Sequence, residues 1–338
     1  MSFTLDGSKI LVTGATGSFG NAFVRRVLRT TGASRLVIYS RDELKQYEMK
    51  QRLHEEGLVD ERLRFFIGDV RDIDRLQRAL SGITVVIHAA ALKQVPTAEY
   101  NPMECIKTNV LGAENVVSAS IDQGVERVIA LSSDKAANPI NLYGATKLCS
   151  DKLFVAANHL AGFKPTRFSV VRYGNVIASR GSVVALFKQL AQTGQPVPIT
   201  DPRMTRFWLT IDHGVDFVLK CLQRMSGGEV FVPKLPSMKV IDVADAVVPG
   251  AKHKFIGIRP GEKLHEIMIT KDDAPNVIEF DDHFVIRPAF AWWQQREADN
   301  GHFKAGRPVA EGFQYSSDIN NQWLTADQFR EMVGMVHA

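Results

Sequence analysis

The sequence predicts an α/β protein: a doubly wound parallel sheet followed by a smaller C-terminal α/β domain. Two observations predict this class. Through the first half of the 338 residues, short runs rich in Val, Ile, Leu and Phe alternate with longer, helix-sized segments, the pattern of parallel sheets covered by helices on both faces. The first apolar run also leads directly into a glycine-rich turn, where such sheets commonly bind a dinucleotide.

Strands and helices are expected in strict alternation up to Tyr173. The strands are expected at 9–13, 35–39, 63–67, 84–88, 126–131 and 167–172. The helices between them are expected at 19–30, 42–55, 72–80, 103–122 and 143–160. Right-handed crossovers wind such a series into an open, Rossmann-type sheet.

The alternation stops after Tyr173. Residues 176–208 mix Gly, Pro and basic residues, a helix is expected at 210–225, and a further strand and helix are expected over 228–247. We therefore expect a dinucleotide-binding domain over 1–175 and a substrate domain over 176–338, with chain crossings back to the first. The tail from about 285 shows no pattern that organises it.

The composition excludes several classes of protein. With 45% hydrophobic and 23% charged residues, the chain is not expected to be disordered. Three cysteines without C-x-x-C spacing indicate neither a disulfide framework nor a cysteine zinc site. No signal-peptide pattern and no long apolar run is present, so we expect a cytoplasmic protein without a membrane partner.

Three glycines in G-x-x-G-x-x-G spacing follow the first expected strand, within TGATGSFG. Glycines in this place allow a tight turn, close approach of the backbone to a pyrophosphate and close packing of the next helix. The start of that helix also favours phosphate. An ordinary glycine-rich turn is the alternative. The expected cofactor contacts here are Gly14, Thr16, Gly17, Ser18, Phe19 and Gly20.

The residues after the second strand indicate which dinucleotide binds. Where an NAD site usually carries an acid for the ribose, this chain has Ser40, Arg41 and Asp42. A guanidinium beside a hydroxyl suits a 2′-phosphate, and Lys45 adds a second cation, so NADP is favoured over NAD. The alternative is that Arg41 caps a surface loop and Asp42 binds the ribose. Further contacts are expected after the third and fourth strands, at Asp69, Val70, Ala89 and Ala90.

Tyr143 and Lys147 are four residues apart in an expected helix and so share one face. A Lys ammonium near the phenol favours phenolate, which would let Tyr143 take an alcohol proton while a hydride leaves the carbon. Chance Y-x-x-x-K pairs are common, and an exposed helix pair is the alternative. The position of this pair, directly after the fifth strand, favours a catalytic pair that also contacts the cofactor.

Six longer motifs carry a family resemblance: TGATGSFG, HAAALKQVP, SSDKAANPINLYGATK, RYGNVIASRGSV, MTRFW and RPGEKLHE. Over roughly residues 9–270 the sequence resembles the extended short-chain dehydrogenase/reductases, and within them the inverting UDP-N-acetylglucosamine 4,6-dehydratases that begin pseudaminic acid synthesis. Asp134-Lys135, where related dehydratases often have Asp-Glu, marks this subgroup. The similar dehydratase-epimerases of capsular N-acetylfucosamine synthesis tend to have Met at the position of Tyr143.

The resemblance implies a reaction and a set of roles. Tyr143 would act as the base in C4 oxidation, Lys135 would remove the C5 proton, and Asp134 would protonate the departing C6 hydroxyl. Lys135 must then be neutral, although its ordinary pKa is about 10.4 and Asp134 opposes the change. Neighbours in an extended segment also point to opposite sides, which would keep the two side chains apart. A UDP-sugar 4-epimerase and a non-catalytic NADP-binding regulator are the alternatives.

The same resemblance implies ligands and partners. Arginines suit a diphosphate and Glu262 suits a ribose hydroxyl. Val176 completes the cofactor contacts. The expected ligands are NADP and UDP-N-acetylglucosamine, and a homo-oligomer is implied. The substrate contacts are expected at Lys93, Asn175, Arg180, Thr200, Arg259 and Glu262.

The net charge of +4 is concentrated in one segment. Residues 151–206 carry eight Lys and Arg against two Asp, a local net of +6, so the remainder of the chain is slightly acidic. We expect this segment to attract a sugar nucleotide rather than a nucleic acid. No metal is required; His88 is expected at a strand end and Asp281–His283 in a solvated loop.

Overall fold

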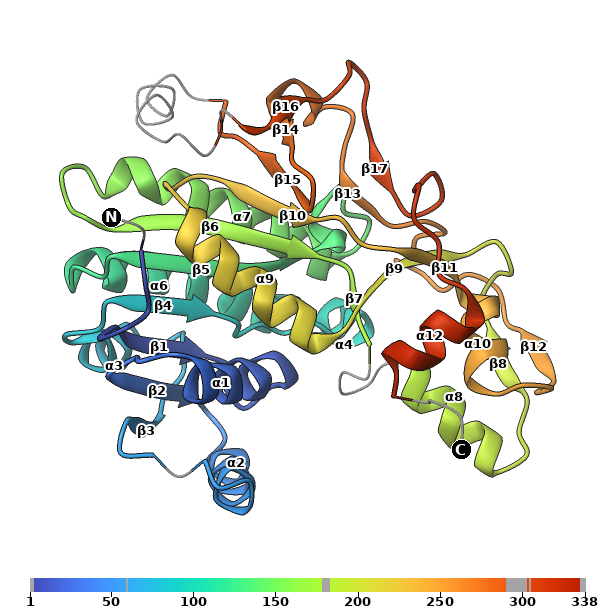
Figure 1. Ribbon diagram of the computed structural model, residues 1–338, viewed down its shortest axis with the longest axis horizontal. Coiled ribbons are helices and arrows are strands. Elements are labelled where there is room, and N and C mark those ends of the chain that lie inside the picture. Colours follow the sequence, from blue (N-terminus) through green and yellow to red (C-terminus); the bar gives the residue numbers. More distant parts are fainter. Residues whose placement is uncertain (1–2, 59, 178–182, 290–302, 304, 335–338) are drawn as a thin grey trace.

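A ten-stranded sheet forms the centre of the molecule, in the order β16-β14-β15-β10-β6-β5-β4-β1-β2-β3 (Figure 1). The computed structural model describes residues 3–58, 60–177, 183–289, 303 and 305–334. Among these residues, no helix combines the length and the apolar character needed to cross a membrane.

The six strands expected from the first half are confirmed, and they pair in parallel. Their order, 3-2-1-4-5-6, is that of the Rossmann fold. The central strands are buried on both faces, which explains their continuous apolar runs. They are β1 (Lys9–Thr13), β2 (Arg35–Ser40), β3 (Leu63–Ile67), β4 (Val85–His88), β5 (Arg127–Ser133) and β6 (Arg167–Tyr173).

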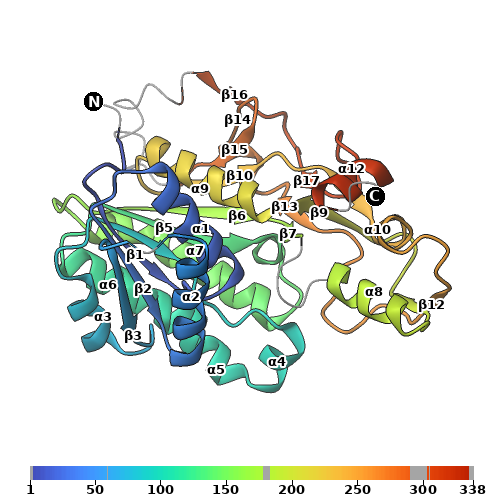
Figure 2. The same ribbon diagram turned by 60° about the horizontal axis from the view of Figure 1, so that its bottom comes forward.

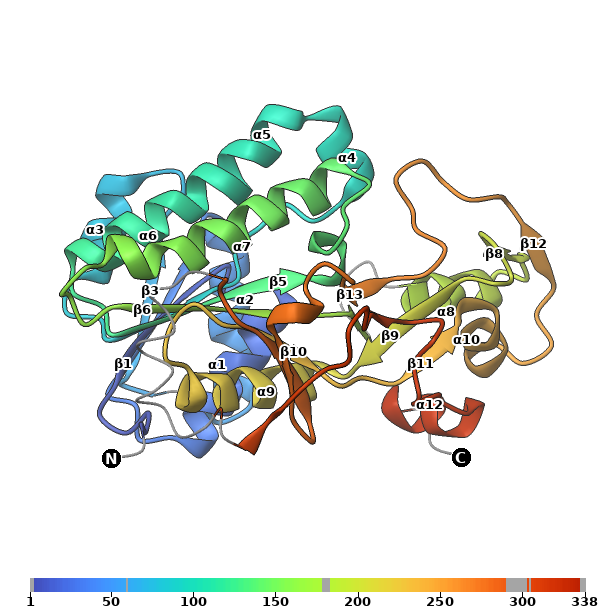
Figure 3. The ribbon, with the colours of Figure 1, turned by 90° about the horizontal axis from the view of Figure 1, so that it is seen from above.

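Helices cover both faces of this sheet (Figure 3). One face carries α3 (Ile73–Leu80), α6 (Gly112–Asp122) and α7 (Leu142–Leu160); the other carries α1 (Ser18–Thr30), α2 (Glu43–Glu55) and α9 (Ile211–Arg224). Figure 2 shows α1 and α9 side by side, in agreement with their direct contact. The single helix expected at 103–122 is divided, and another precedes it: α4 (Val95–Tyr100), α5 (Pro102–Ile106), a π turn at Lys107–Leu111, and α6.

The second half of the chain returns to the main sheet. The strand β10 (Val230–Pro233) pairs in parallel with β6, and β15 (His283–Ile286), β14 (Val277–Glu279) and β16 (Arg307–Pro308) extend the sheet antiparallel. The division at residue 175 and the chain crossings stay a prediction. Beyond residue 175, four strands join the main sheet, and α9 contacts α1, β5 and β6.

A smaller α/β part lies beyond the carboxyl edge of the sheet (Figure 1). Its own apolar cluster contains Phe187, Trp208 and Phe329, with the last two rings 5.3 Å apart. Its elements are β7 (Asn175–Val176), α8 (Val183–Gln192), β8 (Val197–Ile199), β9 (Thr205–Leu209), β11 (Ser237–Lys239), α10 (Val240–Val247), β12 (His253–Phe255) and α12 (Ala326–Met332). Between the two parts, β13 (Ile267–Ile269) pairs with β17 (Tyr315–Ser316).

Candidate active site

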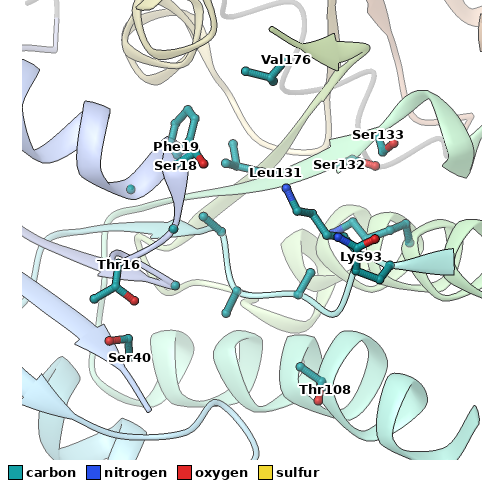
Figure 4. Close-up of a pocket in the computed structure, with 18 of the residues that line it drawn as sticks. Thr16, Ser18, Phe19, Ser40, Lys93, Thr108, Leu131, Ser132, Ser133 and Val176 are labelled. Atoms are coloured by element: carbon teal, nitrogen blue, oxygen red, sulfur yellow. The ribbon is translucent and has the colours of Figure 1, made fainter. Parts of the chain in front are cut away.

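A cavity of about 630 Å³ lies at the carboxyl ends of the parallel strands. Every residue that the sequence predicted as a cofactor contact lines this cavity, together with Asp134 and Lys135. Figure 4 shows Thr16 and Ser40 toward one end, Ser132 and Ser133 at the end of β5 toward the other, and Lys93 between. The volume is within the usual range of small-molecule sites.

The glycine turn after β1 is held against neighbouring backbone. Gly14 has φ +64°, and a Cβ there would lie 2.8 Å from Cα of Ala90; a Cβ on Gly20 would lie 2.4 Å from Cα of Ala15. Larger residues would force the backbones apart. Gly17 is the N-cap of α1 and has no side chain to cover the first turn, so the positive end of the helix dipole faces the cavity.

At the end of β2, the cationic side chains differ in how firmly they are held. The Asp42 carboxylate caps α2, accepting from the Lys45 amide at 3.0 Å and pairing with its ammonium at 2.9 Å. Arg41 is 51% exposed and lies 3.6 Å from Asp69, and Asp69 already accepts two short bonds from Arg71. Arg41 is therefore the more weakly held cation at this end of the cavity.

Tyr143 and Lys147 lie on α7, buried at the cavity wall. The side chain of Asn141 caps this helix by accepting from the Gly144 amide at 2.7 Å. Burial raises the pKa of Tyr143 to about 12, and the cation that opposes the rise is Lys135. Burial lowers the pKa of Lys147, against the charge of Asp151. In the chain by itself, Lys147 therefore does not lower the pKa of Tyr143 as expected from the sequence.

A buried network that the sequence did not predict lies behind Lys147. Asp151, one turn further along α7, accepts from Ser132 Oγ at 2.8 Å and from Arg172 Nη2 at 3.1 Å. Arg172 also donates to the Met268 carbonyl at 2.9 Å. These bonds join α7 to β5 and β6 and fix the helix that carries the Tyr-Lys pair.

The pair Asp134 and Lys135 forms a tight turn of 3₁₀ helix, Asp134–Ala136, rather than an extended segment. Their side chains therefore converge: Lys135 Nζ lies 3.0 Å from Asp134 Oδ1, which also accepts from Ser133 Oγ at 2.8 Å. The prediction that neighbouring side chains would point apart is wrong because it assumed an extended backbone.

Lys135 has a second carboxylate partner, Glu266, with Oε1 3.3 Å from Nζ. Burial alone would lower the pKa of Lys135, but Asp134 and Glu266 outweigh burial and raise it. The resting site thus favours an ammonium, whereas the expected role requires a neutral amine. Any account of the chemistry must say where that proton goes.

Some of the expected substrate contacts line the cavity and others do not. Lys93 and Asn175 line the cavity, and burial lowers the pKa of Lys93. Thr200, Arg259 and Glu262 do not line it; Arg259 is 66% exposed and pairs with Glu262 at 3.0 Å. Arg180 lies outside the described residues. The substrate role of these last four residues stays a prediction.

The basic surplus of residues 151–206 does not form the cavity wall within the described part of the chain. Arg172 and Arg206 are buried and pair with Asp151 and Glu266. The cations that do line the cavity are Arg41, Lys45, Lys93, Lys135 and Lys147. Counting charges along the sequence was misleading because it cannot show which charged side chains form buried pairs with residues distant in the sequence.

No cluster of three or more candidate metal ligands occurs among the described residues. His88 is buried at the end of β4 beside Thr13 Oγ1, and burial lowers its pKa to about 3. His283 is also buried, stacked on Phe280, and Nδ1 lies 2.7 Å from Asp282 Oδ1. The expected solvated loop is present at Asp281 and Asp282, which lie exposed in a bend, but the expectation is wrong for His283, which begins β15.

A family model described as polysaccharide biosynthesis protein matches residues 10–288. The chain belongs to this family. A UDP-N-acetylglucosamine 4,6-dehydratase (inverting) of Campylobacter jejuni strain 81-176 is 53% identical over 97% of this chain and 98% of its own length. The family resemblance stated from the motifs is confirmed.

A second relative and a solved structure are also similar to this chain. A UDP-glucose 4-epimerase of Rickettsia prowazekii is 44% identical over 78% of each chain. The solved structure of Pen from Bacillus thuringiensis is 30% identical, with a TM-score of 0.87 over 98% of this chain and 99% of its own. The architecture of this polysaccharide biosynthesis protein is thus shared over nearly the whole chain.

Several cavity residues of this family member were missed by sequence reasoning. Ser132 and Ser133 lie in a quoted motif, and their position just before Asp134 was the available signal. Thr108 lies in the π turn, a local irregularity common at functional sites. Tyr173 and Trp208 also lie in quoted motifs, RYGNVIASRGSV and MTRFW, but each looks like an ordinary core residue of an apolar strand.

Proposed function

We propose that this chain is an NADP-dependent UDP-N-acetylglucosamine 4,6-dehydratase, a hydro-lyase that inverts C5. Its product would be UDP-2-acetamido-2,6-dideoxy-β-L-arabino-hex-4-ulose, the first step of pseudaminic acid synthesis. One observation carries the proposal: Asp134, Lys135, Tyr143 and Lys147 line the same cavity as the glycine turn. The name of the relative that is 53% identical supports the substrate and the inversion.

NADP fits the cavity on two structural grounds. Gly14 and Gly20 leave no room for side chains in the turn that would receive the diphosphate. Arg41, weakly held beside Asp69, is placed for a 2′-phosphate. When bound next to these residues, NADP would supply a hydride acceptor for C4 of the sugar and a hydride donor for C6. Tyr143 takes the proton of the C4 hydroxyl, and Lys147 contributes positive charge beside it.

The Asp134-Lys135 contact explains how an ammonium becomes a base. Moving one proton across the 3.0 Å contact from Lys135 Nζ to Asp134 Oδ1 leaves a neutral amine beside a carboxylic acid. Once C4 is a ketone, the amine takes the C5 proton while the acid protonates the C6 hydroxyl, which departs as water. The pair returns to ammonium and carboxylate, which balances the elimination. When the hydride has returned to C6, C5 takes up one solvent-exchangeable proton, which balances the proton that Tyr143 removed from the C4 hydroxyl.

The substrate contacts of this proposal are Lys93 and Asn175, the two implied residues that reach the cavity. Lys93 supplies positive charge for the UDP diphosphate, and Asn175 supplies an amide to a sugar hydroxyl. The homo-oligomer belongs to the proposal on the family resemblance alone, and action in the cytoplasm belongs to it on the sequence pattern.

A UDP-sugar 4-epimerase is the second candidate, favoured by the name of the Rickettsia relative. It would use Tyr143 and Lys147 without an elimination. The test is to incubate purified protein with NADP and UDP-N-acetylglucosamine and identify the product by NMR. A 4-keto-6-deoxy sugar supports dehydration, whereas a 4-epimer that retains its C6 hydroxyl contradicts it.

A further inference from the structure

Glu266 is a buried carboxylate beside the reactive pair that no motif assigned to the chemistry. Its side chain is 2% exposed, and Oε1 lies 3.3 Å from Lys135 Nζ. It does not line the cavity. We propose that Glu266 is a positioning residue for Lys135, holding the ammonium from the side opposite the cavity and increasing the basicity of the amine. This role rests on the proposed dehydratase function.

The fold fixes Glu266 from both sides. It directly precedes β13, which packs against the turn that carries Lys135. Its amide donates to Ser317 Oγ at 2.9 Å, and its carbonyl accepts from the Ser317 amide at 2.8 Å. The backbone therefore cannot shift without breaking the pairing of β13 with β17. The position of the Glu266 backbone is therefore fixed by Ser317, about fifty residues further along the chain.

The carboxylate is not fully satisfied by its structural partners. Arg206 Nε approaches the same Oε1 at 3.6 Å, but that guanidinium donates mainly to the carbonyls of Lys263, Leu264 and Thr205. Oε2 of Glu266 is buried without a hydrogen-bond partner in the described part of the chain. A side chain needed only for packing would not retain a buried, half-satisfied charge, because that charge is costly to desolvate.

Charged and titratable groups from several elements surround the Lys135 and Glu266 pair. The positive charge of Arg206 partly opposes the rise in the pKa of Lys135 that the two carboxylates cause. Among the described residues, only Asp134 and Glu266 have a carboxylate within 4 Å of the Lys135 ammonium. The groups are Asp134 from the 3₁₀ turn, Tyr143 from α7, Arg206 from β9, and Glu262, Lys263 and His265 from the segment before β13.

The role follows from the proton balance of the elimination. Lys135 receives the C5 proton, and the ammonium that forms is stabilised by the negative charge of Glu266. A more basic amine removes a weakly acidic C–H proton faster. Replacing the carboxylate by an amide keeps the shape and one acceptor but removes the charge. The Asp134-Lys135 pair then gives up its shared proton at lower pH.

The test is the pH dependence of kcat for wild type and Glu266→Gln, with the 4-keto product measured by NMR. We expect the alkaline limb of Glu266→Gln to lie roughly one to three pH units below that of wild type. We expect kcat at pH 7 to fall about 10- to 100-fold with little change in KM, since Glu266 does not touch the cavity. Glu266→Asp retains the charge and should keep the wild-type alkaline limb.

Glu229→Gln is the matched control. Glu229 is a buried carboxylate that accepts from Ser169 Oγ, and it lies just before β10, at the amino ends of the parallel strands and so away from the cavity. The substitution should change stability without moving the pH profile. An unchanged profile and kcat in Glu266→Gln, or an equal shift in Glu229→Gln, overturns the role. If Glu266→Gln does not fold, a shifted limb in Glu266→Asp overturns it. Wild-type protein without 4-keto product contradicts the proposed function and this role together.

Discussion

Replacing Arg41 by alanine tests the cofactor preference from a single side chain. Its guanidinium is half exposed, and the acidic side chain beside it, Asp69, lies 3.6 Å away and is already held by Arg71. The residue therefore contributes little to the fold. A hydrogen bond to a charged group contributes about 1.5–3 kcal/mol. At about 1.4 kcal/mol per factor of ten, Arg41→Ala should weaken NADP binding by roughly 10- to 150-fold.

Isothermal titration calorimetry with NADP and with NAD gives the two dissociation constants directly. NAD lacks the 2′-phosphate, so its binding should change by less than about threefold, within ordinary neutral-substitution effects. Arg64→Ala is the matched control, because Arg64 is an exposed arginine of β3 whose guanidinium donates to the nearby carbonyls of Glu61 and Leu63. Equal weakening of NADP and NAD, or unchanged NADP binding, would refute the assignment of Arg41 to the 2′-phosphate.

Two further substitutions address the reactive turn and the glycine turn. Lys135→Met should lower kcat by about 10²- to 10⁴-fold in the product assay. It should also reduce the free energy of unfolding by roughly 2–4 kcal/mol in urea, because Asp134 and Glu266 lose their shared cation; retention of half the wild-type rate would rule out Lys135 as the base. Gly20→Ala places a Cβ 2.4 Å from Cα of Ala15, so unfolding should become easier by about 1–3 kcal/mol and NADP binding weaker. A fully stable variant with wild-type NADP affinity would show that α1 does not need this close approach.

The six parallel strands of the first half were predictable because the central ones are buried on both faces. Runs such as 9–13 and 84–88 have to be apolar throughout, and this signal is local in the sequence. The glycine turn was predictable for a similar reason, since backbone contact with Ala15 and Ala90 excludes other residues. In both cases the structural constraint acts on residues that are adjacent in the sequence, so a short motif is enough to reveal it.

The interior of the site was less predictable because its partners are distant along the chain. Lys135 and Glu266 meet only because β13 returns beside the turn after β5. Arg206 was counted in the basic segment 151–206 that was expected to attract a sugar nucleotide, yet its guanidinium is buried against the segment before β13. The sequence shows the residue types, and the topology decides which of them become pairs.

The local backbone also changed the expected chemistry of one pair. Asp134 and Lys135 were expected to diverge in an extended segment, whereas the 3₁₀ turn brings their charged ends to 3.0 Å. Ser133, whose Oγ accepts from the Lys135 amide, stabilises that turn. Such a side-chain bond to the backbone is a weak signal in sequence but decides the geometry here.

The central claim is that Lys135 and Asp134 exchange protons with C5 and the C6 hydroxyl of UDP-N-acetylglucosamine. Incubation with this substrate and NADP in D2O, followed by NMR of the product, tests it most directly. The account predicts a 4-keto-6-deoxy sugar with inverted configuration at C5 and deuterium at C5. A product without deuterium at C5, or with the original C5 configuration, would contradict the account.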